Sequence, residues 1–121
     1  MTNTLENLKT AILKHMDCVD DEDFRNTMRD VSSHGADGGV PSFTYTKDCV
    51  DFYEDNEDYI YELANETAEN MGYDSVIKFI SDFNNAYMAD SADGHKNLLA
   101  WFALEEVARW MEDEKVERLE N

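Results

Sequence analysis

The sequence predicts an all-α fold, a compact bundle of five or six helices around a buried C-terminal helix. Three observations support this fold class. Apolar residues recur every three or four positions over most of the 121-residue chain, which is the period of a helix with one buried face. Three of the five glycines and the only proline fall in residues 35–42, so few residues interrupt helices elsewhere. One C-terminal segment is apolar on nearly all sides.

That segment is residues 98–111, LLAWFALEEVARWM, whose only polar members are Glu105, Glu106 and Arg109. At about 100° per residue these three fall within an arc of roughly 100°. A helix with one narrow polar face belongs in the middle of a bundle, and we expect the rest of its surface to be buried. The large side chains expected in this core are Trp101, Phe102 and Trp110.

The first helix is expected over residues 4–17, with Thr4 or Asn3 as its N-cap. Its buried face is marked by Leu5, Leu8, Ile12 and Met16. The acidic residues 20–23 then open a second helix, because negative charge is favourable at a helix N-terminus. Its apolar face comprises Phe24, Met28 and Val31, and Gly35 is expected to end it.

Residues 35–42, GADGGVPS, form a loop, and the FTYT that follows is a candidate extended piece. The loop matches neither GxGxxG nor GxxxxGK[ST], so we interpret it as a connector rather than a phosphate site. Residues 46–71 are helical, either as one helix or as two broken near Asp55 and Asn56, and Gly72 ends them.

A shorter helix is expected from Tyr73 or Asp74 through Phe83. Its core-facing residues are predicted to be Val76, Ile77, Ile80 and Phe83. Residues 84–94 are small and polar and read as a second loop. The C-terminal helix is expected to begin near His95. No linker divides the chain, whose length suits a single acidic helical domain over residues 1–121.

The net charge of −18 is unevenly distributed along the chain. Residues 47–93 carry 13 acidic and 2 basic residues, a charge of −11, against −4 before them and −3 after them. Solubility and adaptation to high salt are the alternative explanations of the charge, although a general adaptation to salt does not predict such a concentration. A chain this acidic lacks the basic patch that bare nucleic acid or an anionic membrane requires.

Seven carboxylates in this middle third, here called the acidic row, fall in one arc of about 120° when residues 46–71 are placed on a helix. They are Asp51, Glu54, Asp55, Asp58, Glu62, Glu66 and Glu69. No lysine or arginine lies four positions after any of them. Because like charges at this spacing cost a few tenths of a kcal/mol per pair, we interpret the acidic row as a partner-binding face.

Carboxylates four residues apart on a helix are separated by about 6 Å along its axis. That spacing lies within a factor of two of the phosphate repeat of about 3.4 Å along one nucleic-acid strand. The acidic row is therefore predicted to occupy a basic groove built for DNA or RNA. Five nearby tyrosines are candidates for stacking on arginine or lysine there, or for ordinary half-buried packing: Tyr45, Tyr53, Tyr59, Tyr61 and Tyr73.

No catalytic or metal-binding signature accompanies this charge. The windows closest to a calcium-binding loop, from Asp51 and Asp90, fail at the glycine or at the ligand positions. His15, His34 and His95 are far apart and read as surface or cap residues. We therefore expect no enzyme activity, metal or cofactor.

Compartment and thiol chemistry can also be read from the sequence. Cys18 and Cys49 lack CxxC spacing and read as reduced thiols. The polar start of the chain and the lack of about 20 uncharged residues in a row predict a cytoplasmic protein without a membrane partner.

In size, charge and rows such as DFYEDNEDYIYELANETAEN, the chain resembles small acidic helical inhibitors made by bacteriophages, namely DNA-mimic antirestriction and anti-CRISPR proteins. The resemblance implies that it blocks a basic nucleic-acid-binding protein or complex of the host, in the host cytoplasm, without binding nucleic acid itself. Two alternatives remain: a phage accessory protein that binds a protein partner through an apolar surface, and a small metal-dependent enzyme. Residues 98–111 are also a candidate homodimer interface.

Overall fold

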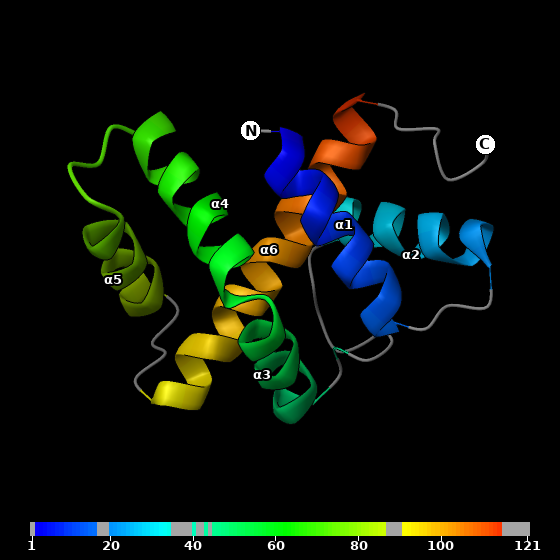
Figure 1. Ribbon diagram of the computed structural model, residues 1–121, viewed down its shortest axis with the longest axis horizontal. Helices are drawn as coiled ribbons and strands as arrows, with labels where there is room; N and C mark the ends of the chain where they lie inside the picture. The colour runs from blue at the N-terminus through cyan, green and yellow to red at the C-terminus, as the bar shows by residue number, and fades with distance from the viewer. Residues whose placement is uncertain are drawn as a thin grey trace.

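The computed structural model describes residues 2–16, 20–34, 40, 43, 45–86 and 91–114. Six helices account for nearly all of these residues (Figure 1). They are α1 (Thr2–Met16), α2 (Asp21–His34), α3 (Thr46–Asp55), α4 (Glu57–Asn70), α5 (Val76–Ala86) and α6 (Ala92–Glu114). In Figure 1, α6 crosses the molecule on a diagonal, with α4 and α5 on one side, α2 on the other, and α1 passing in front of it.

The C-terminal helix is the centre of the bundle, as predicted. α6 packs against α1, α2, α3 and α4, and its most extensive contact is with α3. The ring of Phe102 also contacts α5, at centroid distances of 5.8 Å from Phe79 and 5.5 Å from Phe83. The buried residues of α6 are Leu99, Ala100, Phe102, Ala103, Leu104, Val107, Ala108 and Met111. Trp101 and Trp110 are only partly buried at the edge of this core, whereas we expected them inside it.

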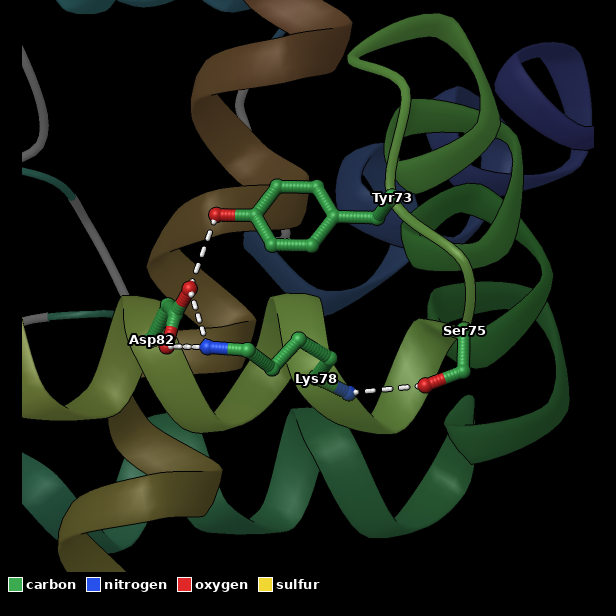
Figure 2. Close-up of polar contacts among 4 residues, drawn as sticks. All are labelled: Tyr73, Ser75, Lys78 and Asp82. Atoms are coloured by element: carbon green, nitrogen blue, oxygen red, sulfur yellow. Dashed lines mark hydrogen bonds and ion pairs between the residues drawn. The ribbon is translucent and has the colours of Figure 1, made fainter.

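Side chains just before three of the helices fix where those helices begin. The carboxylate of Asp20 accepts the Asp23 N–H at 2.8 Å before α2, and the hydroxyl of Ser91 accepts the Gly94 N–H at 3.0 Å before α6. The Ser75 hydroxyl does the same for the Lys78 N–H at 3.2 Å before α5 (Figure 2). Because such caps satisfy otherwise orphaned amides, α6 begins at Ala92, one turn before the expected His95.

The N-terminus of the first helix differs from the prediction. α1 begins at Thr2, so Thr4 lies inside its first turn instead of capping it. The Thr4 side chain is buried and contacts α4, and this tertiary contact replaces the expected cap. The predicted ends of the first two helices, at Asp17 and Gly35, lie outside the described residues.

The acidic middle of the chain folds as two helices, which confirms one of the two alternatives. Asn56 interrupts them with φ −130° and ψ 26°, and its N–H still donates to the carbonyls of Phe52 and Tyr53, both at 3.1 Å. The Asn56 side-chain amide donates to the Phe52 carbonyl at 2.9 Å, while its own carbonyl accepts the Ile60 N–H and starts α4. One asparagine therefore closes α3 and opens α4.

Gly72 ends this segment, as predicted. Its φ of 85° lies in the left-handed region that favours glycine. The Gly72 N–H donates to the Glu69 carbonyl at 3.1 Å, and the Tyr73 N–H donates to the Ala68 carbonyl at 2.9 Å. These bonds satisfy the last carbonyls of α4 and turn the chain toward α5.

The prediction for α5 is wrong at Ile77 and at the start of the helix. α5 begins at Val76 instead of at Tyr73 or Asp74, and Ile77 is 72% exposed. Phe79 occupies the core instead and is 5% exposed. Because residues two apart on a helix point about 200° away from each other, only one of the two can face the core.

None of the helices in the described part of the chain is both long and apolar enough to cross a membrane.

Candidate interaction surface

The acidic row is divided by the interruption at Asn56. Asp51, Glu54 and Asp55 lie on α3, and the four others, Asp58, Glu62, Glu66 and Glu69, lie on α4. We call these the α3 half and the α4 half. The row is therefore two shorter rows on separate helices and not one straight line of charge.

The α3 half is partly neutralised by lysines. Lys47 Nζ lies 2.9 Å from a carboxylate oxygen of Asp51, and Lys96 Nζ, from α6, lies 2.7 Å from Glu54. Hydrogen bonds to these carboxylates raise the pKa of both lysines above the usual value. The sequence carried a signal for the first pair, because Lys47 lies four positions before Asp51. It carried none for the second, whose partners are 42 residues apart.

The α4 half lies on the outward side of its helix. Ile60, Leu63, Ala64 and Ala68 face the core, while Asp58, Glu62 and Glu69 are exposed. On an ideal helix those three carboxylates fall within about 40° of one another. Within the described residues, no hydrogen bond or ion pair engages the carboxylate of Asp58 or that of Glu69.

Two members of the α4 half contact α1. The buried hydroxyl of Thr4 donates to Glu62 Oε1 and lies 3.4 Å from Glu66 Oε2. A threonine hydroxyl has one proton, so it serves one carboxylate fully and the other weakly. This contact joins α1 to α4 and leaves Glu62 exposed to solvent.

The five tyrosines divide into accessible and structural ones. Tyr45, Tyr59 and Tyr61 are 72%, 41% and 46% exposed. Tyr53 is partly buried, and burial raises its pKa. The Tyr73 hydroxyl donates to Asp82 at 3.1 Å in the cluster drawn in Figure 2.

Asp82 links α5 to the turn before it. Lys78 Nζ lies 2.8 Å from Asp82 Oδ1, and with the Tyr73 hydroxyl it forms the cluster of Figure 2. Hydrogen bonds from Lys78 and Tyr73 lower the pKa of Asp82 below its usual value. Each group in this cluster is occupied by its neighbours, so the cluster reads as a structural support for α5.

Two hollows adjoin the α3–α4 junction. One, of about 360 Å³, is lined by Glu54, Asp55, Asn56, Glu57, Asp58 and Tyr59. The other, of about 530 Å³, is lined by Ala11, Lys14, His15, Asp55 and Asn56. Neither hollow was predicted from the sequence, because both depend on the bend at Asn56 and on where α1 packs. The predicted break near Asp55 and Asn56 was the one available signal.

Groups with chemical reactivity are engaged in packing. The Cys49 thiol is buried and accepts a hydrogen bond from Trp101 Nε1 at 3.1 Å, and burial raises its pKa to about 11. At neutral pH it is therefore a poor nucleophile. The His15 ring, in the last turn of α1, packs edge-on against Phe43 and Phe52, at 5.0 and 5.3 Å, and is therefore half-buried.

The structure also bears on metal binding. Within the described residues, no three of the histidine, cysteine, aspartate and glutamate side chains are grouped so that they could hold a metal ion. The side chains of Cys18 and His34 lie outside the described part.

A family model described as "Domain of unknown function (DUF7222)" matches residues 6–117, which is nearly the whole chain. Comparisons with curated proteins and with solved structures gave no match. The family match spans all six helices except the first residues of α1, and therefore both halves of the acidic row. The chain belongs to the DUF7222 family.

Proposed function

We propose that this protein is a non-enzymatic inhibitor whose acidic surface docks on the basic, nucleic-acid-binding surface of a host defence complex, of the anti-CRISPR or antirestriction kind. In this proposal it acts as a mimic of DNA and binds no nucleic acid itself. One observation carries the proposal: the most charged part of the chain places exposed carboxylates along the outward face of α4, where no lysine of the described residues neutralises them.

The charge distribution gives this face a physical advantage in association. Summed negative charge steers a positively charged partner toward the surface and raises the association rate, most strongly at low ionic strength. The lysines that pair with Asp51 and Glu54 reduce the charge of the α3 half. The α4 half is therefore the centre of the proposed docking face, with Asp58 and Glu69 as its freest carboxylates. Tyr59 and Tyr61 lie on the same helix and offer rings on which arginine side chains can stack.

The test exchanges these two carboxylates for lysine and follows capture of host proteins. In Asp58→Lys with Glu69→Lys, we expect loss of captured nucleic-acid-binding proteins from a host lysate, identified by mass spectrometry. The matched control is Glu112→Lys with Asp113→Lys, which changes the net charge equally at two exposed residues of α6. Glu62 and Glu66 are left intact because they contact Thr4.

Mimicry adds a second requirement to that experiment. Duplex DNA added to the wild-type complex should release the captured partner, because DNA and the inhibitor occupy the same groove. The proposal is contradicted if both double variants still capture the partner. It is also contradicted if added DNA does not release the partner from the wild-type protein.

A second candidate function rests on a different surface. Met71 and Ile77, at the α4–α5 corner, are 61% and 72% exposed. Exposed apolar residues of this size favour the alternative of an accessory protein that binds a protein partner through apolar contacts. In that case Ile77→Ser abolishes capture, and the lysine variants of α4 do not.

A further inference from the structure

We propose that the two hollows at the α3–α4 junction form one groove, the junction groove, for a partner segment that carries a basic and an acidic side chain a few positions apart. The inference rests on the proposed function and deepens it, because it names the charge pattern that the docked protein presents. The junction groove lies beside the α4 face. Unlike a uniformly acidic surface, it has one acidic end and one positively charged end.

The two hollows adjoin because Asp55 and Asn56 line both of them. Asn56 is fixed there by its side-chain bond to the Phe52 carbonyl and by its place between α3 and α4. The groove therefore crosses a rigid junction between two helices. Its lining residues come from the consecutive helices α3 and α4 and from α1, which is distant from them in sequence.

One end of the junction groove is acidic. Beyond Asp55 it is lined by Glu54, Glu57 and Asp58, with the exposed ring of Tyr59 at its edge. Lys96 engages one oxygen of Glu54, while no hydrogen bond or ion pair within the described residues engages the Asp58 carboxylate. A guanidinium group fits this end well, because it pairs with carboxylates and stacks on aromatic rings.

The other end carries positive charge from α1. Lys14 is exposed in the last turn of α1, and His15 beside it is held by Phe43 and Phe52. Lys14 and Asp55 line the same hollow, yet within the described residues no hydrogen bond or ion pair engages the Lys14 ammonium or the Asp55 carboxylate. The Lys14 ammonium is thus available to an acidic side chain.

Charge complementarity selects the occupant. A segment with only basic residues is attracted to the acidic end and repelled at Lys14. Nucleic acid is repelled by the acidic end, and a second copy of this chain brings a net charge of −18. A segment with one charge of each sign satisfies both ends, so we assign the groove to a protein partner of that pattern.

The probes are synthetic peptides with blocked ends, in which arginine and aspartate are separated by one to four glycines. Each has a partner peptide with asparagine in place of aspartate. Binding to the ¹⁵N-labelled full chain is measured by NMR titration at low ionic strength. For at least one spacer length, we expect the aspartate peptide to bind roughly two- to fivefold more tightly. General attraction to an acidic protein predicts the opposite order, because the asparagine peptide carries more positive charge.

Lys14→Gln tests the assignment of the positive end. It should remove the preference for aspartate, whereas the matched variant Lys47→Gln, which removes a lysine outside both hollows, should keep it. The peptide proposal is overturned if no spacer favours aspartate or if Lys14→Gln leaves the preference intact. These results are separable from those of the capture experiment. If the α4 variants lose capture but no peptide shows the preference, the docking face stands and the junction groove is contradicted. If a peptide shows the preference but the α4 variants keep capture, only the docking face is contradicted.

Discussion

The α3 and α4 halves of the acidic row are neighbours in sequence and differ in how their charges are held. In the α3 half, Asp51 and Glu54 each contact a lysine at less than 3 Å. In the α4 half, the contacts within the described residues come from the neutral hydroxyl of Thr4. The three carboxylates of the α3 half and the four of the α4 half therefore differ in how much of their charge is paired with lysine. The comparison teaches that the charge available to a partner depends on tertiary contacts as well as on composition.

The largest expected effect comes from removing the anchor of α3. Phe52 is fully buried, and its ring lies 5.1 Å from that of Phe43. Only Cys49 and Phe52 are buried in α3, whereas α4 has four buried residues. Phe52→Ala should lower the free energy of unfolding by about 3–5 kcal/mol, measured by urea denaturation. Tyr45→Ala, which truncates an exposed ring, is the control, and a loss below about 1 kcal/mol in Phe52→Ala contradicts the assignment of Phe52 as the anchor.

A smaller effect is expected in the α4 half from Thr4. Thr4→Val keeps the shape of the side chain and removes the buried donor that serves Glu62. The loss should be about 1 kcal/mol, because Glu62 is exposed and water can replace part of the bond. Thr4→Ser retains the hydroxyl and serves as the control in urea denaturation. If Thr4→Ser is the less stable of the two, the methyl group and not the hydrogen bond is what holds α1 to α4.

Local features of this fold were predictable from the sequence, whereas contacts between distant residues were not. The apolar period of each helix, the stop at Gly72 and the break near Asn56 are local properties of a few adjacent residues. The first two were predicted, and the break was one of two alternatives. The contacts of Thr4 with Glu62 and of Lys96 with Glu54 join residues 58 and 42 positions apart. No periodicity reports such pairs, so the division of the acidic row into two unequal halves was not predictable.

The same limit explains the errors in α5 and α1. Both Ile77 and Phe79 fit an apolar helical pattern, and the choice between them depends on which side of α5 meets α4 and Phe102. The larger aromatic ring takes the core position and stacks on Phe83 at 5.9 Å. Thr4 fits an N-cap pattern equally well, until α4 supplies carboxylates to its hydroxyl. Packing between helices overrides a local preference in both cases.

The pairing in the α3 half should be visible in the pH dependence of stability. The pKa of Lys96 in the folded state is raised above 10.5, chiefly by its hydrogen bond to Glu54. A raised lysine pKa contributes stability that is present below pH 10.5 and is lost as the pH rises through the folded-state value. Lys96→Gln should therefore lower the thermal midpoint at neutral pH, and its difference from wild type should shrink above pH 10.5. A difference that persists at high pH would indicate that Lys96 acts through packing of its methylenes.

The smallest expected effect compares one carboxylate from each half, neutralised to the same extent. Glu69→Gln removes a negative charge from the last turn of α4, where the helix dipole disfavours it, and relieves repulsion with Glu66. It should raise the free energy of unfolding by about 0.3–0.5 kcal/mol. Glu54→Gln removes the same charge and also the partner of Lys96, so it should be the less stable variant. Because both variants have the same net charge, general repulsion cancels in the comparison. Salt should narrow the difference in free energy of unfolding between the two variants, because exposed charges are screened. If the two variants are equally stable at low salt, pairing with lysine does not distinguish the two halves.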